Sequence, residues 1–255
     1  MALQIVTIPC LSDNYAYLIR DKDTDQVAVV DVPDAAPIIG ALKDLDWSLD
    51  KILITHHHYD HIDGVEALKA ETNAQVYGAK ADVHRLPALD VELSEGDTFK
   101  LGNETCDVLD VSGHTVGHIA FVFKNAEAAF SADSLMALGC GRLFEGDAKM
   151  MWRTMEKFKA LSEDTLVYSG HEYTSSNAAF AITIEPDNAD LQTRIEDIND
   201  KRANDIPTVP ASIGLEKATN PFMRADLKEV KVLVGMVGAS NEDVFGEIRR
   251  RKDNF

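Results

Sequence analysis

Four histidines and an aspartate fall within the seven residues Thr55-His56-His57-His58-Tyr59-Asp60-His61, half of the 8 histidines in the chain. The apolar run Lys51–Ile54 comes directly before them and predicts a buried strand. Imidazole and carboxylate groups at the end of a strand make a poor core, but they are common ligands of zinc, iron and manganese. The spacing therefore predicts a metal site.

Three more candidate ligands lie downstream, each after a predicted strand and each beside small residues that allow a sharp turn. The full candidate set is His56, His58, Asp60, His61, His114, Asp133 and His171. One catalytic zinc ion takes about three protein ligands and leaves a position for water. A set of this size suits two ions that share a carboxylate. We interpret His57, His84 and His118 as ordinary hydrogen-bonded residues.

The elements that must position these ligands change in character near residue 172. Strands are predicted at Gln4–Ile8, Tyr15–Arg20, Gln26–Asp31, Lys51–Ile54, Gln75–Tyr77, Cys106–Val111, Ile119–Phe123, Ala128–Phe130 and Thr165–Tyr168. Helices are predicted at Asp34–Leu45, Val65–Ala70, Ala148–Leu161, Tyr173–Ile184, Ala189–Asn204, Ser212–Lys217, Ala225–Val232 and Glu242–Arg251. We expect an α+β fold with two domains, residues 1–171 and a helical domain over residues 172–255.

The composition of the chain disfavours several classes of partner and site. The net charge of −18 disfavours a nucleic-acid ligand, which would need clustered cations. The 3 cysteines, Cys10, Cys106 and Cys140, are far apart, which disfavours disulfides and a thiolate zinc site. We see no apolar run long enough for a bilayer and no export signal. We therefore expect a cytoplasmic protein with no nucleic-acid or membrane partner, and we further expect a monomer.

The histidine segment resembles the T-H-x-H-x-D-H signature of the metallo-β-lactamase superfamily, whose fold is an αββα sandwich. The resemblance implies a catalytic domain over residues 1–171 that holds two divalent metal ions, with zinc expected and iron or manganese as alternatives. It assigns His56, His58 and His114 to the first ion. It assigns Asp60, His61 and His171 to the second, with Asp133 as the bridge.

Four further segments narrow the resemblance to the glyoxalase II (hydroxyacylglutathione hydrolase) family across essentially the whole chain. They are Gly139–Gly146, Gly170–Thr174, Asn220–Arg224 and Arg249–Phe255. This family has a small all-α C-terminal domain after the sandwich. The resemblance implies hydrolysis of S-(2-hydroxyacyl)glutathione, such as S-D-lactoylglutathione, to glutathione and a 2-hydroxy acid such as D-lactate, in methylglyoxal detoxification.

The resemblance also implies a mechanism and a substrate site. A hydroxide between the two metals would attack the thioester carbonyl, with Asp60 and Asp133 as the catalytic carboxylates. Arg249 and Lys252 would bind the glycine carboxylate of glutathione, and Arg142 and Tyr173 would contact it elsewhere. The alternative interpretation of the basic run Arg249–Lys252 is local, because cations in the last turn of a helix complement its dipole.

Three positions depart from the family pattern. Phe144 stands where the animal enzymes have tyrosine, so one hydrogen bond to the substrate is lost. Ala132 stands where glycine is common, and Asp31-Val32-Pro33 stands where Asp-Pro is common. We expect neither of these two departures to touch a metal ligand.

Other functions fit the same signature. The nearest alternative is a glutathione persulfide dioxygenase with one iron ion, which would lack a helical C-terminal domain of this form. A lactonase or β-lactamase would have no use for Arg249 and Lys252. A metal-binding protein without catalysis is the alternative from a different class, and any turnover would exclude it.

Overall fold

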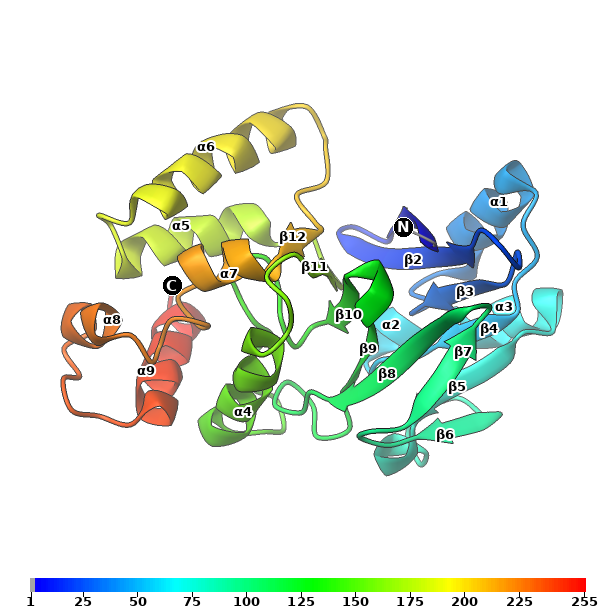
Figure 1. Ribbon diagram of the computed structural model, residues 1–255, viewed down its shortest axis with the longest axis horizontal. Helices are drawn as coiled ribbons and strands as arrows, with labels where there is room; N and C mark the ends of the chain where they lie inside the picture. Colours follow the sequence, from blue (N-terminus) through cyan, green and yellow to red (C-terminus); the bar gives the residue numbers. More distant parts are fainter. Residues whose placement is uncertain (1–2) are drawn as a thin grey trace. The chain divides into compact units, whose positions relative to one another are not determined.

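The computed structural model describes residues 3–255, which form two compact units (Figure 1). The first, here called the sheet unit, comprises the described residues up to Asp110 together with Gly117–Ala132. The second, the helical unit, comprises Val111–Val116 and Asp133–Phe255. The units do not divide at residue 172, because α4 (Ala148–Lys159) packs against the C-terminal helix α9 (Asn241–Asp253).

The first sheet of the sheet unit has six strands in sequence order. They are β1 (Leu3–Cys10), β2 (Asn14–Asp21), β3 (Val27–Val30), β4 (Lys51–Leu53), β5 (Gln75–Ala79) and β6 (Val91–Leu93). The first three pair antiparallel and the last four pair parallel. Helices α1 (Ala35–Leu45) and α3 (Val65–Thr72) make crossover connections between the parallel strands.

The second sheet of the sheet unit contains four antiparallel strands in the order β10-β9-β8-β7. Their bounds are β7 (Thr98–Leu101), β8 (Glu104–Asp110), β9 (Ile119–Phe123) and β10 (Ala128–Ala132). Aromatic rings join the two sheets, with Tyr17 5.7 Å from Phe130 and Tyr77 5.1 Å from Phe99 between ring centroids. The sheets therefore pack face to face.

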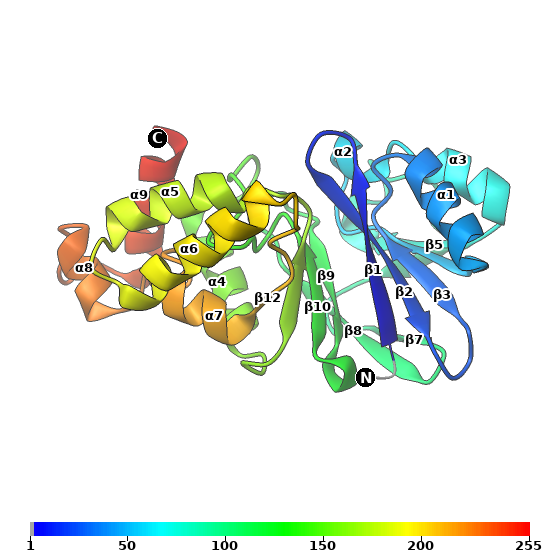
Figure 2. The ribbon, with the colours of Figure 1, turned by 90° about the horizontal axis from the view of Figure 1, so that it is seen from above.

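Successive side chains of a strand point to opposite faces of its sheet, and this alternation separates the two packed layers on either side of the first sheet. Tyr17 points toward the second sheet, whereas its neighbours Ala16 and Leu18 join Ile38 and Leu68 in the core beneath α1 and α3. Figure 2 shows these two helices on the outer face of the first sheet. The sheet unit thus has a helical layer over two stacked sheets.

The helical unit contains six helices and one short strand pair among its described residues. The helices are α4, α5 (Thr174–Ile184), α6 (Ala189–Ala203), α7 (Ile213–Thr219), α8 (Lys228–Leu233) and α9, and the strands are β11 (Leu166–Ser169) and β12 (Ala211–Ser212). Side chains of Asp147, Asn188 and Ser240 cap α4, α6 and α9 by accepting backbone N–H groups. Leu138, Ala181, Leu191 and Ile198 form a core where α5 packs on α6.

Each predicted strand and helix is confirmed, with ends that shift by a few residues. Three strands and one helix were not predicted: β6, β7, β12 and α2 (Tyr59–Ile62). All four of these elements have four residues or fewer, and β6, β12 and α2 show little periodicity to detect. The alternation in Thr98–Leu101 was a usable signal, because β7 joins β8 through a turn at Gly102, whose φ is 59°.

A buried ion pair in the helical unit fixes the turn before Cys140. Glu216, 1% exposed, pairs with Arg194 and accepts hydrogen bonds from the Leu138 amide (3.0 Å) and from Asn220 Nδ2 (2.9 Å). Asn220 also donates to the Gly139 carbonyl (3.0 Å). The network therefore ties α6 and α7 to one loop.

We expect Glu216→Ala to lower the free energy of unfolding by about 3–5 kcal/mol, because Arg194 would become an uncompensated buried cation. Urea denaturation followed by far-ultraviolet circular dichroism measures the change. The matched control is Glu163→Ala, which removes an exposed partner of Lys217 and should cost less than about 1 kcal/mol. Equal losses in the two variants would contradict the structural role of Glu216.

Candidate metal centre

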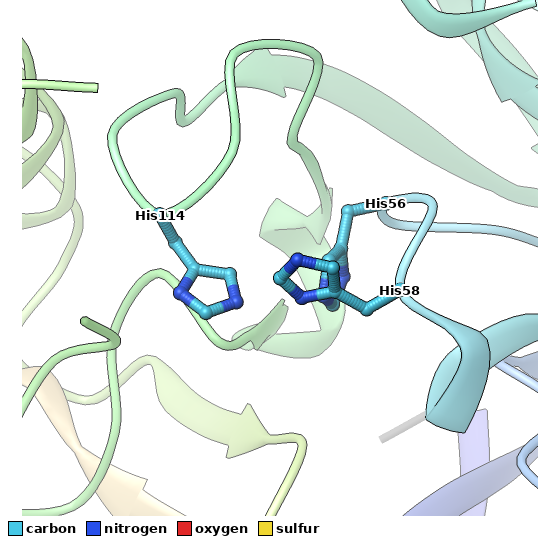
Figure 3. Close-up of side chains that lie close together, drawn as sticks. All are labelled: His56, His58 and His114. Atoms are coloured by element: carbon cyan, nitrogen blue, oxygen red, sulfur yellow. The ribbon is translucent and has the colours of Figure 1, made fainter. Parts of the chain in front are cut away.

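The histidine segment lies at the carboxyl edge of the first sheet. Backbone hydrogen bonds from Ile54 to Tyr77 (2.8 Å) and from Ile119 to Thr55 (2.9 Å) continue β4 up to the segment. His58 then stands at the N-cap of α2, and this helix carries Asp60 and His61. Figure 3 shows the rings of His56 and His58 on this loop, with His56 Nε2 3.1 Å from His58 Nδ1.

Asp31 organises two of these histidines. Its Oδ2 atom lies 2.8 Å from His61 Nδ1 and 2.8 Å from Thr55 Oγ1, and that hydroxyl lies 3.0 Å from His56 Nδ1. A carboxylate only accepts, so His61 donates from Nδ1, and Thr55 donates to Asp31 while it accepts from His56. With Nδ1 as the donor, Nε2 is the candidate ligand atom of each ring, and outer carboxylates orient metal-binding histidines in this way.

The expectation that the Asp31-Val32-Pro33 departure touches no ligand is therefore wrong. Asp31 contacts a ligand directly, and atoms of Asp31, His56 and His61 that can bind a metal all lie within 4.8 Å of one another. A sequence signal was present. Asp31 ends a predicted strand next to β4, so its side chain falls at the same sheet edge as the histidines.

Asn14 fixes the position of Asp60. Its Nδ2 atom donates to both the Oδ2 atom (3.1 Å) and the backbone carbonyl (3.0 Å) of Asp60. Asn14 is only 4% exposed, and it opens β2, 46 residues before Asp60 in the chain. The sequence offered no signal for this pairing, because it depends on which loops meet.

The helical unit holds the other three candidate ligands. His114 projects from the loop that follows β8, as Figure 3 shows, and donates from Nδ1 to the Arg142 carbonyl (2.7 Å). Its Nε2 atom is 3.5 Å from Asp133 Oδ2, and His171 Nε2 is 3.4 Å from the same oxygen. One carboxylate oxygen therefore lies close to nitrogens of two candidate ligands.

Two residues with positive φ shape the loops around these ligands. Gly113 has φ 146°, and a Cβ added there would lie 2.8 Å from Met151 Cβ, so only glycine fits beside α4. Ala132 has φ 42°, in the left-handed region where glycine costs least. This departure therefore keeps a backbone conformation that glycine favours.

The donor set fits a divalent metal. The described candidates offer imidazole nitrogens and carboxylate oxygens, and four of these candidates, His56, His61, His114 and His171, are at most 4% exposed. Imidazole nitrogens and negative carboxylate oxygens together favour a cation. The chemistry of these groups supports a divalent metal site.

The two histidines near the ligands that we interpreted as ordinary have structural contacts. His57 Nδ1 lies 3.2 Å from Asp82 Oδ2, and Asp82 also pairs with Arg85. The ring of His118 stacks on that of His56, with 4.4 Å between centroids and 10° between planes. His57 therefore contacts a carboxylate outside the histidine segment, and His118 packs on a candidate ligand.

A cavity of about 450 Å³ opens within the helical unit beside its ligands. We call it the cationic cavity, and its lining is His114, Asp133, Met136, Cys140, Gly141, Arg142, Phe144, Tyr173, Ser176, Asn177, Arg249 and Lys252. All four residues predicted to bind substrate are in this lining. Burial raises the pKa of the Cys140 thiol to about 11, so this side chain is no nucleophile near neutral pH.

Aromatic rings flank the ligands at the mouth of the cationic cavity. Phe144, 62% exposed, packs edge-on against His114 with 5.3 Å between centroids. Tyr173 stacks on His171 at 4.6 Å with 8° between planes. At the position where the animal enzymes have a tyrosine, this chain therefore offers an apolar ring edge without a hydroxyl.

We expect Asp31→Asn to weaken metal binding by about 10–100-fold, because the amide cannot hold both Thr55 and His61 as a carboxylate does. Competition against a chromophoric chelator measures the affinity without any assay of turnover. The matched control is Asp50→Asn, since Asp50 also accepts a backbone N–H, that of Val27 at 2.8 Å, but belongs to no candidate metal group. Equal metal affinities in the two variants would contradict the role of Asp31.

Among the described residues, none of the helices has the length and apolar character needed to cross a membrane.

Two family profiles match the chain. The profile of the metallo-beta-lactamase superfamily matches residues 12–171, and that of the hydroxyacylglutathione hydrolase C-terminus matches residues 172–255.

Relatives and solved structures agree with the profiles. A hydroxyacylglutathione hydrolase of Ruegeria pomeroyi is 58% identical over 255 residues, which is 100% of both chains, and one of Jannaschia is 59% identical over 99% of this chain and 98% of the relative. The crystal structure of ETHE1 from Myxococcus xanthus has a TM-score of 0.68 at 25% identity, covering 98% of this chain and 90% of that one. The BLEG-1 B3 metallo-beta-lactamase has a TM-score of 0.67 at 22% identity over 86% and 99%. The chain has an α+β metallo-β-lactamase fold followed by a helical region, and it belongs to the hydroxyacylglutathione hydrolase family of the metallo-β-lactamase superfamily.

Proposed function

We propose that the protein hydrolyses the thioester bond of S-(2-hydroxyacyl)glutathione, with S-D-lactoylglutathione as the main substrate and glutathione and D-lactate as products. Full-length relatives at 58% and 59% identity bear the name of this hydrolase. The observation that carries the proposal is the cationic cavity, which is lined by the candidate ligands His114 and Asp133 and by the cations Arg249 and Lys252. An anionic thioester needs both kinds of group.

The proposal includes two divalent metal ions, with zinc preferred and iron or manganese as alternatives. His56, His58 and His114 would hold one ion, and Asp60, His61 and His171 the other, with Asp133 shared. When bound, such ions lower the pKa of a water molecule toward 7 and polarise a carbonyl oxygen. The residues of this chain fix the ligands, since Asp31 and the Arg142 carbonyl each hold one imidazole by its Nδ1 atom.

The remaining chemistry needs little from the side chains. A glutathione thiolate is a stable leaving group because a thiol has a pKa near 8.5, so no general acid is required for its departure. Asp60 and Asp133 serve as ligands in this proposal and not as free bases. Arg142, Tyr173, Arg249 and Lys252 would bind and orient the glutathione part of the substrate.

We propose the division of labour that the family profiles support. Residues 1–171, which include the match to the superfamily profile, would carry the metal chemistry. Residues 172–255, which match the C-terminal profile, would provide the cations Arg249 and Lys252 for the glutathione carboxylate. The chain would thus act on a small anionic molecule.

The direct test is hydrolysis of S-D-lactoylglutathione, followed by the loss of thioester absorbance, with metal analysis of the same sample. Asp133→Ala should lower kcat/KM by at least about 1,000-fold and lower the metal content, because it removes a carboxylate next to two ligands. Asp107→Ala, which removes a surface partner of Lys124, should leave both near the parent values. Oxygen consumption with glutathione persulfide and no thioester hydrolysis would favour the dioxygenase alternative.

A second prediction concerns pH. Burial, helped by the positive charge of Arg249, lowers the pKa of Lys252 to about 8. Below that pH the ammonium attracts the substrate carboxylate, and above it the attraction is lost. We expect KM to rise about three- to tenfold between pH 7 and pH 9, an effect separate from the pH profile of kcat. Lys252→Arg keeps its charge over this range, so its KM should stay flat, and identical KM profiles would contradict the assignment.

A further inference from the structure

The run Arg249–Lys252 divides between two faces of α9. Arg250 and Arg251 both pair with Glu247, at 2.8 and 2.9 Å, and neither lines the cationic cavity. Arg249 and Lys252 do line it. The helix therefore separates two ordinary surface cations from two that face the cavity.

Arg249 is held on every side. It is 7% exposed, and its guanidinium carbon lies 5.2 Å from the centroid of the Phe222 ring. Its Nη1 atom donates to the Cys140 carbonyl (3.0 Å), while Nε and Nη2 contact Asp253 Oδ1 at 3.0 and 2.9 Å. All three nitrogens of the group are therefore engaged, and Asp253 holds two of them.

The same carboxylate oxygen reaches a second cavity residue. Asp253 Oδ1 lies 3.4 Å from Nε of Arg142, whose side chain is 56% exposed. One acidic side chain thus contacts two of the cations that line the cationic cavity, the buried Arg249 and the exposed Arg142.

Asp253 breaks two local rules of helix stability. A carboxylate in the last turn of α9 faces the negative end of the helix dipole, which is unfavourable. Its partner Arg249 stands four residues before it, and the acid-before-base order is the better one for such pairs. Glu247 obeys that order toward Arg250 and Arg251. The position of Asp253 is therefore better explained by the cavity than by the helix.

We propose that Asp253 is a positioning residue for substrate binding, which holds Arg249 and Arg142 in the orientations that receive the glutathione part of the thioester. This inference rests on the proposed function. Without the carboxylate, the nearly buried Arg249 would lose the acceptor of two of its nitrogens, and Arg142 would lose the ion pair with Asp253 that directs its side chain. Substrate would then have to order two mobile cations when it binds, and the entropy lost in this ordering would weaken its affinity.

The test compares Asp253→Asn with the parent protein, using both KM for S-D-lactoylglutathione and the Kd for glutathione by calorimetry. We expect KM and Kd to rise about tenfold while kcat stays within about twofold, since the lost interaction concerns binding and not the reacting bond. Asp253→Glu, which restores a carboxylate, should recover at least half of the loss on a logarithmic scale. A purely structural role would lower kcat and thermal stability together and would not show this split.

Glu247→Gln is the matched control, because it removes an acidic partner of two arginines from the same helix but from outside the cavity. It should leave KM and Kd within about twofold of the parent values. An unchanged or lowered KM in Asp253→Asn, with an active parent enzyme, would overturn the inference and leave the proposed function intact. A parent protein without thioester hydrolysis would instead overturn the proposed function.

Discussion

Burying imidazole rings requires a hydrogen-bond acceptor for one nitrogen of each ring, and much of the site is built around that constraint. In the sheet unit, the Asp31 carboxylate accepts from His61 and, through the Thr55 hydroxyl, orients His56. In the helical unit, the Arg142 carbonyl accepts from His114. Each acceptor fixes Nδ1 as the donor of its ring, which assigns Nε2 as the candidate ligand atom.

This constraint links the metal chemistry to the fold. Asp31 reaches the histidines because β3 and β4 are parallel neighbours whose carboxyl ends share one sheet edge. The Arg142 carbonyl reaches His114 because the chain after Asp133 turns back over the His114 loop, as the hydrogen bonds from Gly141 to Asp133 (2.8 Å) and from Phe144 to His114 (3.2 Å) show. Glu216 and Asn220 in turn hold the preceding loop. Stability and ligand geometry therefore depend on the same backbone segments.

The cations of the cationic cavity are subject to a similar constraint. A buried or half-buried cation must be paired or stacked, and Arg249 is both, with Asp253 on one side and Phe222 beneath. Lys252 donates to the Ser176 carbonyl (3.0 Å) and lies over the rings of Phe180 and Phe255. These contacts place positive charge in the cavity without leaving it mobile. Arg249 and Lys252 thus have contacts outside α9 in addition to their place near the end of the helix.

The sequence was enough to predict most of the strands and helices, the histidine segment and the kind of atoms that the candidate ligands offer, because these follow from local periodicity and from side-chain chemistry. It also carried the family resemblance that the profiles and relatives confirm. It indicated that Asp31 ends a strand near the histidines, but it could not show that Asp31 holds His61, that Asn14 holds Asp60, or that Asp253 joins Arg249 to Arg142. All three contacts join residues far apart in the chain. The third also depends on which face of α9 turns toward the cavity. Only the tertiary structure decides such contacts, because hydrogen bonds and ion pairs need atoms within about 3–4 Å, and packing alone brings those atoms together.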